Sequence, residues 1–200
     1  MLDGIIKYNF DFQKSDSLEE RMFSEIEAVR ERLYALGFIG VYADGVGYGN
    51  ISERVDGSSF VITGTQTGHL QNLEAKHYAL VEAFNDKEFY LKSSGAIKPS
   101  SEALTHGTIY NLSFEIGAVI HIHSTVIWEF MLKNNYLKTA DVEYGTVAMI
   151  DEVNRVFSTI DPLFNPKFVM LGHEEGVMTF GRDLAEAELV LFEVLGSLLL

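Results

Sequence analysis

Apolar residues near the start of the chain recur at every third or fourth position, with polar residues between them. The repeating positions are Leu18, Met22, Ile26, Val29, Leu33 and Leu36. This period places the apolar side chains on one face of an α-helix. A capping-box pattern at residues 17–20 comes before the repeat, and Gly37 follows it as a stop signal. The pattern predicts an amphipathic helix over residues 17–36.

Farther along the chain, short apolar runs rich in β-branched residues predict strands, and longer periodic segments predict helices. The expected strands are 60–63, 78–84, 89–92, 118–122, 167–171 and 176–180, with a hairpin turn at 85–87. The expected helices are 101–112, 125–132 and a last one that Asp183 caps and that runs to residue 195. Strands between terminal helices indicate a layered α/β or α+β domain, while periodicity alone leaves the topology open.

The composition is that of a folded protein with a sizeable core. The chain has 200 residues, 47% of them hydrophobic, and it contains no linker, repeat or low-complexity run. We therefore expect residues 1–200 to form a single domain. The absence of cysteine excludes disulfides and thiolate metal ligands, and it is compatible with the cytoplasmic location that we expect.

The formal net charge of −14 narrows the range of partners. It argues against nucleic acid and against an anionic membrane surface, because both require a basic patch. Residues 1–8 lack the basic start and apolar core of a signal peptide. The apolar stretch 189–200 is shorter than the ~18 residues of a membrane span, so we interpret it as the end of a buried helix that packs against another subunit. An anionic substrate would require a local positive site, such as a metal ion or a helix N-terminus.

Three histidines are candidates for a metal site. His121 and His123 lie two residues apart at the end of an apolar run, and residues i and i+2 of a strand point to the same face. Both imidazoles can therefore reach one ion, and imidazole suits zinc and related metals. His173 follows a second apolar run and would complete a set with one open position. The alternatives are polar residues at a solvated strand end, a turn histidine, or ligation by Glu174 or Glu175.

A carboxylate lies at the expected start of a helix, where Glu102 follows Ser100 and Ser101. The helix dipole stabilises such a carboxylate, so one interpretation is simple capping. The other is a general base or a displaceable metal ligand, beside an anion site built from the serine hydroxyls and the backbone N–H groups. The loops 49–52 and 63–68 are rich in glycine and hydroxyl groups, and they allow two interpretations, phosphate binding or turns alone.

The order of five short blocks along the chain carries more information than any one of them. The blocks are Gly-Asn-Ile-Ser at 49–52, Ile-Thr-Gly-Thr-Gln-Thr-Gly at 62–68, Pro-Ser-Ser-Glu at 99–102 followed by His106 and Ile109-Tyr110, Ala-Val-Ile-His-Ile-His-Ser at 118–124, and Gly-His with Gly-Val-x-x-x-Gly at 172–181. In this order the blocks resemble the class II aldolase/adducin family. The similarity spans about residues 18–195, nearly the whole chain.

The resemblance implies an α/β fold with three α/β/α layers and a central, mostly antiparallel sheet. It implies a site for zinc or another divalent cation at His121, His123 and His173, and an acid/base role for Glu102. In family members that act on sugar phosphates, the phosphate binds residues that match Asn50, Thr67, Gly68, Ser100 and Ser101. The implied protein is a metal-dependent aldolase for a small carbohydrate, assembled as a homotetramer with its active site at a subunit boundary.

The chain departs from the family pattern in two places. Family members place the third histidine directly before a glycine, whereas Glu174 and Glu175 follow His173 here. Either His173 or Glu175 can then take the ligand position, and we favour His173 because imidazole completes the familiar set. The loop 63–68 is longer than in the sugar-phosphate aldolases, which leaves phosphate itself open.

Alternative functions fit the same resemblance. Sugar-phosphate epimerases and dehydratases of the family share the metal, but the epimerases carry aspartate where this chain has Glu102, which favours the aldolase. An adducin-like assembly domain is a non-catalytic alternative, although such domains lack the metal-binding histidines. In family aldolases a tyrosine serves as the second acid, and Tyr136 and Tyr144 are the candidates by position.

Overall fold

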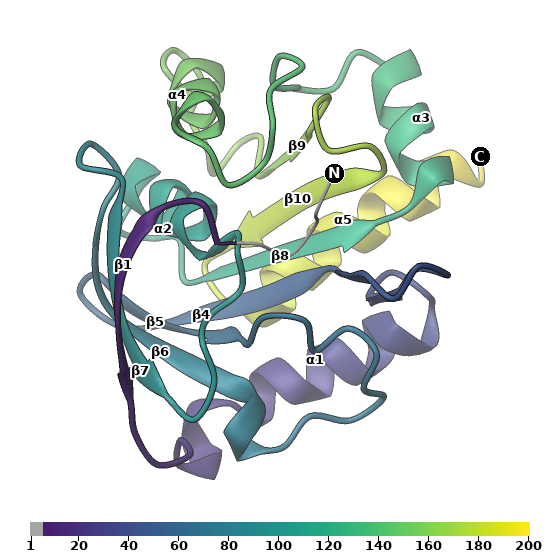
Figure 1. Ribbon diagram of the computed structural model, residues 1–200. Coiled ribbons are helices and arrows are strands. Elements are labelled where there is room, and N and C mark those ends of the chain that lie inside the picture. The colour runs from purple at the N-terminus through teal and green to yellow at the C-terminus, as the bar shows by residue number, and fades with distance from the viewer. Residues whose placement is uncertain (1–5) are drawn as a thin grey trace.

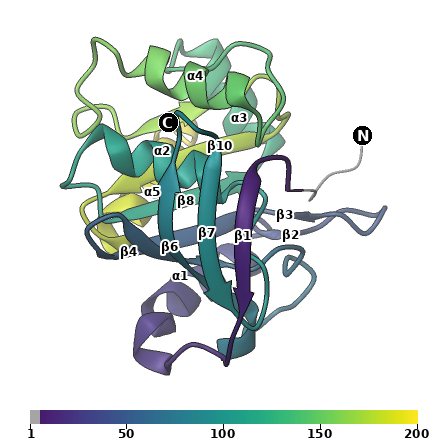
Figure 2. The ribbon, with the colours of Figure 1, turned by 60° about the vertical axis from the view of Figure 1, so that its left-hand side comes forward.

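An eight-stranded sheet forms the centre of the protein in the computed structural model, which describes residues 6–200 (Figure 1). In sheet order the strands are β1 (Asn9–Lys14), β7 (Tyr90–Gly95), β6 (Tyr78–Asn85), β5 (Ser59–Thr63), β4 (Asn50–Asp56), β8 (Ala118–His123), β10 (Gly176–Gly181) and β9 (Lys167–Val169). Neighbouring strands are antiparallel except β1 and β7, which run parallel side by side at one edge (Figure 2). Strands β2 (Gly40–Val41) and β3 (Gly47–Tyr48) form a separate small hairpin.

Helices cover both faces of this sheet. Within residues 6–200 the α-helices are α1 (Ser24–Ala35), α2 (Ala103–Leu112), α3 (Thr125–Lys133), α4 (Val147–Val156) and α5 (Leu184–Leu198). The apolar side chains of α2 and α4 belong to one core cluster, and those of α1, α3 and α5 belong to another. The expected three-layer α/β/α fold with a mostly antiparallel sheet is therefore confirmed. None of the helices that the structure describes is long and apolar enough to span a membrane.

Strand β8 contributes side chains to both cores and so determines where its histidines point. Val119 packs in the core with α2 and α4, whereas Ile120 and Ile122 pack in the core with α1, α3 and α5. Because successive side chains of a strand alternate between faces, His121 and His123 project from the same face as Val119. All residues of β8 are buried, so both imidazoles lie in the interior on the α2 side of the sheet.

Most of the predicted elements are present, with ends shifted by a few residues. Asp183 caps α5, since its side chain accepts a hydrogen bond from the backbone N–H of Glu186. The observed elements without a predicted counterpart include the strands β1, β2, β3 and β4 and the helix α4. Strand β1 is an edge strand with mostly exposed side chains, so its sequence lacks an apolar run. Helix α4 does carry a readable signal, because the Thr146 side chain caps it and its buried residues recur at helical spacing.

The first helix starts later than predicted. Residues Glu20–Met22 form a 3-10 turn, and α1 begins only at Ser24. Between the two, Phe23 leaves the helical backbone with φ −137°, and its buried ring stacks on Tyr78 of β6 with 4.7 Å between the centroids. Packing of this ring against the sheet therefore overrides the capping-box pattern at residues 17–20. The predicted stop at Gly37 is confirmed, with φ +74° in the left-handed region that favours glycine.

The interpretation of residues 49–52 as a loop is wrong. Only Gly49, with φ +78°, makes the turn, and Asn50 begins strand β4. A side chain at position 49 would meet Ile39 Cγ1 at 2.8 Å, so glycine also allows the close approach of the two segments. The register of β4 then places Asn50 directly opposite His121 of β8.

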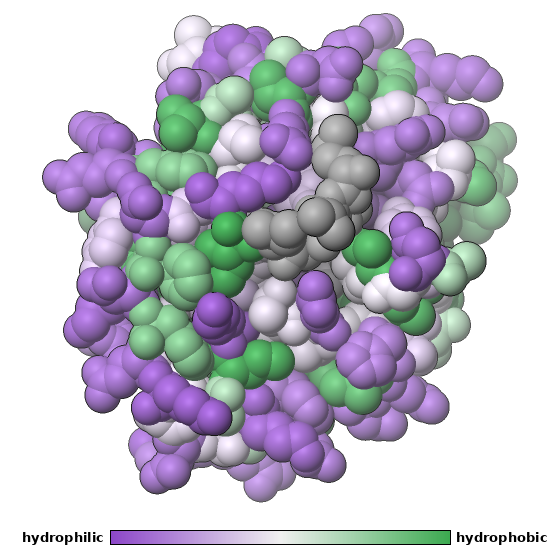
Figure 3. Space-filling view, viewed as in Figure 1, coloured by the Kyte–Doolittle hydropathy of each residue, from purple (hydrophilic) through white to green (hydrophobic). Residues whose placement is uncertain are grey.

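The surface fits the acidic composition. Polar side chains cover most of the face seen in Figure 3, and apolar ones form small patches between them. Single exposed apolar residues are ordinary on a folded protein. The surface view therefore singles out no large apolar face in this orientation.

Candidate metal centre and active site

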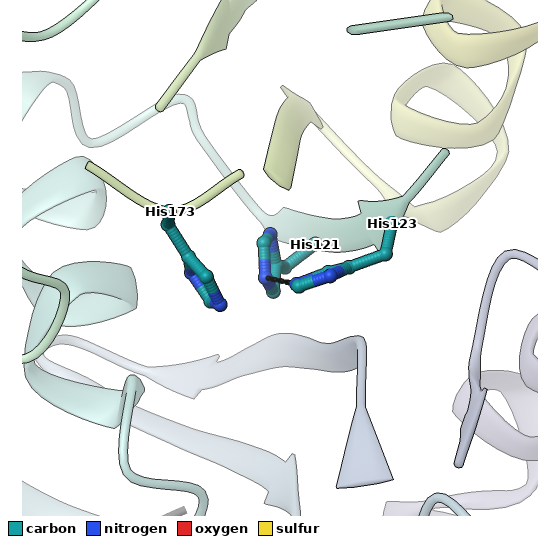
Figure 4. A group of neighbouring side chains, drawn as sticks. All are labelled: His121, His123 and His173. Atoms are coloured by element: carbon teal, nitrogen blue, oxygen red, sulfur yellow. Dashed lines mark hydrogen bonds between the residues drawn. The ribbon is translucent and has the colours of Figure 1, made fainter. Parts of the chain in front are cut away.

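The three predicted histidines converge on one point (Figure 4). His121 and His123 come from β8, and His173 comes from the turn between β9 and β10. One ring nitrogen of each residue lies within 4.8 Å of the corresponding atoms of the other two. The Nε2 atoms of His121 and His123 are 3.0 Å apart. The sequence therefore placed His121 and His123 on one face of a strand, and the fold brings the ring of His173 next to them from the β9–β10 turn.

Hydrogen bonds at the other ring nitrogens determine the tautomers of the two strand histidines. His121 Nδ1 lies 3.2 Å from the Val177 carbonyl oxygen, which can only accept, so Nδ1 carries the proton. His123 Nδ1 lies 2.6 Å from the Tyr42 hydroxyl, whose own proton is donated to Glu175 Oε2 at 2.6 Å. Nδ1 of His123 is therefore the donor as well. In the neutral rings both Nε2 atoms then present a lone pair to the centre of the cluster.

Burial and charge favour a neutral ring at His123. Burial lowers the pKa of His123 well below its ordinary value, and the neighbouring His121 and His173 rings lower it further. A neutral imidazole is the form that binds a metal ion. The electrostatics of the pocket thus agree with the lone pair that the hydrogen bonds place on Nε2.

Glu102 faces the same point from the N-terminus of α2. Its side chain is almost completely buried and makes no capping hydrogen bond, so the capping interpretation fails. Oε2 accepts a hydrogen bond from Asn50 Nδ2 at 2.8 Å and lies 3.0 Å from His121 Nε2. Oε1 lies 3.3 Å from His173 Nδ1, but neither atom has a hydrogen-bond partner of good geometry among the described residues. Burial by itself raises the pKa of Glu102, yet the His121 and His173 rings and Asn50 together bring it below its usual range.

This donor set fits a divalent cation. Three imidazoles are a ligand set that zinc and related metals take when thiolates are absent, and the Glu102 carboxylate lies beside them. Buried polar atoms normally have partners, so the unpartnered Oε1 of Glu102 and Nδ1 of His173 require an explanation. A cation among these atoms would supply it, and the residues present therefore fit the group that the resemblance implies.

The turn after β9 brings His173 into place with the help of Gly176. The Gly176 N–H donates to the His173 carbonyl at 2.8 Å, and Gly176 lies opposite His123 in the β8–β10 pairing. A Cβ at position 176 would lie 2.7 Å from the His173 carbonyl oxygen and 3.2 Å from His121 Cε1. Glycine at this position therefore lets the turn lie close to the ring of His121.

A buried polar network ties α2, and with it Glu102, to strand β4. The Ser52 hydroxyl contacts His106 Nδ1 at 2.7 Å and the Tyr110 hydroxyl at 2.8 Å. Burial lowers the pKa of His106 to about 3, so this ring is neutral at physiological pH. His106 and Tyr110 lie one helical turn apart and present both groups to the same strand. Their positions in the sequence motif thus correspond to an anchor for α2 rather than to the metal.

One cleft collects nearly all the predicted site residues. Its lining includes Asn50, Thr67, Gly68, Ser100, Ser101, Glu102, His123 and His173, while His121 lies beside Glu102 and His123. The loop 63–68 forms one wall and the N-terminus of α2 another. Among the described residues of this lining there is no lysine or arginine. A bound anion would therefore depend on the metal, the hydroxyl groups and the helix N-terminus.

Two residues of the loop have clear structural duties besides any contact with a ligand. The Thr67 hydroxyl donates to the Gly64 carbonyl at 2.9 Å. A Cβ at Gly68 would lie 2.0 Å from the Gly40 carbonyl oxygen, so only glycine fits against the β2–β3 hairpin. Gln66 between them has φ +55°, an unusual conformation for a non-glycine residue, at the wall of the cleft.

Two tyrosines stack on the histidines; Tyr144 was a candidate from the resemblance, whereas Tyr48 was not identified from the sequence. Tyr48 stacks on His123 with 5.3 Å between the ring centroids, and Tyr144 stacks on His173 with 4.4 Å. Both tyrosines line the cleft. Of the two tyrosines considered as a second acid, Tyr136 instead packs beside Phe130, with 6.2 Å between the ring centroids, and is not part of the cleft lining.

The alternative ligand Glu175 is engaged elsewhere. Its Oε2 accepts from Tyr42, and its Oε1 accepts from the Thr125 hydroxyl at 2.5 Å. The described group of converging ligand atoms contains His173 and neither Glu174 nor Glu175. This geometry supports His173 as the third ligand.

A buried arginine on α1 holds the loop that forms the cleft wall. Arg30 is 1% exposed, and its guanidinium donates to the backbone carbonyls of Thr67, Leu70 and Gln71 at 3.3, 2.6 and 3.0 Å. Its charge is balanced by Glu27 at 3.9 Å. Three backbone carbonyls that lose contact with water on folding therefore depend on the Arg30 side chain for their hydrogen bonds.

We expect Arg30→Met to lower the free energy of unfolding by about 2–4 kcal/mol, because it leaves buried carbonyls and Glu27 without their partner. Urea unfolding measures this change. Arg32→Met is the matched control, since Arg32 is 52% exposed and pairs with Glu188 at the surface. Its cost should stay under about 1 kcal/mol. Equal losses in the two variants would contradict the role of Arg30 in holding the loop.

Comparisons with known proteins agree with this geometry. The model of the Class II Aldolase and Adducin N-terminal domain matches residues 31–196. A sugar-phosphate aldolase from Thermotoga maritima aligns over 90% of this chain and 94% of its own, with a TM-score of 0.66 and 19% identity. An L-fuculose 1-phosphate aldolase aligns over 91% and 84%, with a TM-score of 0.67 and 15% identity. YgbL from Klebsiella pneumoniae aligns over 90% and 87%, with a TM-score of 0.65 and 16% identity.

The structural matches at these identities establish a common fold and leave the reaction to be tested. The family match is broader evidence, because it covers most of the chain and includes every block of the sequence resemblance. The resemblance inferred from the order of those blocks is confirmed. This chain belongs to the class II aldolase and adducin N-terminal domain family.

Proposed function

We propose that the protein is a metal-dependent aldolase that cleaves a carbon–carbon bond of a small ketose phosphate. The observation that carries the proposal is the position of His121 Nε2, which lies 3.0 Å from both His123 Nε2 and Glu102 Oε2. Electron-rich atoms at this separation repel one another unless a positive charge lies among them. A divalent cation held by three histidines supplies that charge and leaves a coordination position for a substrate.

The proposed metal ligands are His121, His123 and His173, and zinc is the ion that we favour. Imidazole nitrogen suits zinc, and the chain has no cysteine to offer a thiolate. When bound, such a cation supplies Lewis-acid stabilisation of the negative charge that develops on the substrate as the carbon–carbon bond breaks. The remaining chemistry falls to the side chains of the cleft.

Glu102 is the proposed acid/base residue, and Oε1 is the atom that exchanges the proton with the substrate carbon. Oε2 is held by Asn50, whereas Oε1 has no hydrogen-bond partner among the described residues. In its ionised form this carboxylate can act as a general base. Asn50 thereby orients the carboxylate so that one oxygen remains available.

The proposed phosphate site lies at the N-terminus of α2. Ser100 and Ser101 precede the helix, where backbone N–H groups and the helix dipole favour an anion. Thr67 and Gly68 line the same cleft from the loop 63–68, and Asn50 lines it while donating to Glu102. Because this cleft wall offers hydroxyl and N–H groups without a basic side chain, the phosphate would be bound mainly by hydrogen bonds.

Tyr144 is the proposed second acid, the group that serves the oxygen of the departing aldehyde. It lines the cleft and stacks on His173, whereas the other candidate, Tyr136, is not part of the lining. A phenol that lines the cleft can donate a proton to a substrate bound there.

The assembly and the location of the protein stay predictions. We propose a homotetramer in the cytoplasm, with a small carbohydrate as the only non-protein partner besides the metal. Phe114 and Phe164 are 94% and 82% exposed, and such rings are apolar groups that a subunit contact can bury. Light scattering of the purified chain tests the assembly directly.

Product analysis tests the proposed reaction. The zinc-loaded protein is incubated with a panel of ketose phosphates and with the matching unphosphorylated ketoses, and the products are identified by mass and chirality. We expect two shorter carbonyl fragments from a phosphorylated substrate. A product of unchanged mass would show that the protein is an epimerase and not an aldolase. A product lighter by one water molecule would show that it is a dehydratase. No turnover by protein with stoichiometric metal would favour a non-catalytic assembly domain.

A further inference from the structure

A chain of hydrogen bonds runs from the candidate metal centre to the two-glutamate insertion after His173. His123 Nδ1 contacts the Tyr42 hydroxyl at 2.6 Å, and the same hydroxyl donates to Glu175 Oε2 at 2.6 Å. Tyr42 comes from the β2–β3 hairpin, and Glu175 comes from the β9–β10 turn. Two segments that are distant in sequence thus meet behind one histidine of β8.

The direction of both hydrogen bonds follows from the donor inventory. An ionised carboxylate can only accept, so the Tyr42 proton points at Glu175. The tyrosine oxygen is then left as an acceptor, and His123 must donate its Nδ1–H to it. The Nε2 lone pair of His123 is consequently directed at His121 and the centre of the cluster.

Glu175 is held in an unusual conformation by several contacts. Its φ of +67° lies in the left-handed region, which costs free energy for a residue with a side chain. The Thr125 hydroxyl donates to its other carboxylate oxygen at 2.5 Å, and the Ser124 N–H donates to its carbonyl at 3.0 Å. Both partners lie at the start of α3, directly after β8. Glu175 is therefore held by the two residues that directly follow His123 in the chain.

We propose that Tyr42 and Glu175 are positioning residues that orient His123 as a metal ligand, an inference that rests on the proposed metal site. The Glu175 carboxylate accepts a hydrogen bond from Tyr42, and the tyrosine oxygen accepts one from His123 Nδ1–H. These hydrogen bonds keep the proton on Nδ1 and make Nε2 the more basic nitrogen. Outer hydrogen bonds of this kind fix the ring and strengthen the ligand. This gives a role to the insertion of Glu174 and Glu175 between His173 and Gly176. The same turn carries the proposed third ligand, His173, and the residue that supports His123, Glu175.

Zinc affinity tests the inference, measured by competition with a fluorescent chelator at neutral pH. Tyr42→Phe should weaken zinc binding by about 10- to 100-fold, the usual cost of losing an outer hydrogen bond to a ligating histidine. Tyr90→Phe is the matched control, because it also removes a tyrosine hydroxyl that donates to a carboxylate, Asp11 Oδ2 at 2.8 Å, but at the β1–β7 edge of the sheet, away from the histidines. This control should bind zinc as the wild type does. Equal affinities of the two variants would overturn the proposal.

Charge is tested with a second pair of variants. Glu175→Gln keeps an oxygen acceptor for Tyr42 but loses the negative charge, so we expect a smaller loss of zinc affinity than for Tyr42→Phe. Glu174→Gln is the control, since Glu174 is exposed and adjacent. A loss in Glu174→Gln as large as that in Glu175→Gln would mean that only the net charge of the turn matters, and it would overturn the assignment to Glu175.

A spectroscopic measurement separates this inference from the metal site itself. Nitrogen chemical shifts of the imidazoles in metal-free protein at about pH 8, above the ordinary pKa of histidine, report which nitrogen carries the proton. We expect Nδ1–H at His123 in the wild type and loss of this preference in Tyr42→Phe. Wild-type protein that binds no zinc but keeps the Nδ1–H signal would refute the metal site alone. Zinc binding with His123 protonated at Nε2 in the metal-free state would refute the positioning role alone.

Discussion

Glu102→Gln is expected to lower kcat by about 10²–10⁴-fold, the usual contribution of a positioned general acid or base, while the variant retains its metal. Glutamine has nearly the same shape, and its amide oxygen can still accept from Asn50. It cannot take a proton from carbon at the position of Oε1. The three histidines are unchanged, so the metal content should stay near that of the wild type.

The measurement is turnover of the substrate found in the panel, beside metal content by elemental analysis on the same sample. Glu115→Gln serves as the control, because Glu115 is 65% exposed and pairs with Arg182. That variant should match the wild type in both readings. Wild-type turnover in Glu102→Gln would remove Glu102 from the mechanism, and loss of the metal together with turnover would make the residue chiefly a ligand.

His121→Ala is expected to abolish stoichiometric metal binding. The side chain is fully buried at the centre of the cluster, and its Nε2 lies next to both His123 and Glu102. Two histidines and a carboxylate would remain, but the nitrogen that contacts both is lost. Elemental analysis on untagged protein should find about one zinc per wild-type chain, the stoichiometry of a mononuclear catalytic site, and none in the variant.

His69→Ala is the control for the loss of an imidazole, since His69 is exposed and contacts only the loop carbonyl of Gln66 at 3.1 Å among the hydrogen bonds described. It should keep its metal. Zinc at 100 times the dissociation constant should stabilise the wild type by about 2.7 kcal/mol, and this gain should vanish in His121→Ala. If His121→Ala does not fold, His123→Gln gives the same test with a smaller change in volume. No metal in the wild type, even after zinc is added back, would favour an assembly domain without catalysis.

His121 and His123 show what local periodicity can predict. The spacing of His121 and His123 on an apolar run was enough to place both rings on one side of a strand, because alternation is a property of the extended backbone. The spacing did not show which face of the sheet the two rings lie on. That followed from the packing of Val119 with α2 and of Ile120 and Ile122 with α5.

Glu102 shows the opposite case. From its position at a helix start, capping was the simpler interpretation, and the resemblance alone favoured chemistry. In the structure the side chain makes no capping hydrogen bond and lies beside Asn50 and the histidines, which removes the capping interpretation and supports the proposed role. The direction of that side chain depends on β4 lying beside β8, a pairing of residues 71 positions apart in the case of Asn50 and His121.

Tyr42 carried no readable signal, and Glu175 was considered only as an alternative metal ligand and not as a partner of Tyr42. Tyr42 lies in a glycine-rich turn, and Glu175 in a turn between two short strands, where polar residues are expected in any fold. The chain of hydrogen bonds from His123 through Tyr42 to Glu175 forms only when the β2–β3 hairpin and the β9–β10 turn meet at the same end of β8. The departure of the chain from the family motif was visible in sequence, but its consequence was not.

By itself, the sequence determined the fold family, most helices and strands, the acidic composition and the candidate histidines and glutamate that the fold brings together. These depend on residue type and short-range spacing, which the backbone periods of helix and strand translate directly into faces and ends. The tertiary structure alone decided the start of α1, the strand at residues 50–56, the engagement of Glu175 with Tyr42 and Thr125, and the hydrogen-bond partners of the two strand histidines. Each of these depends on a contact between segments far apart in the chain, and local spacing carries no information about such contacts.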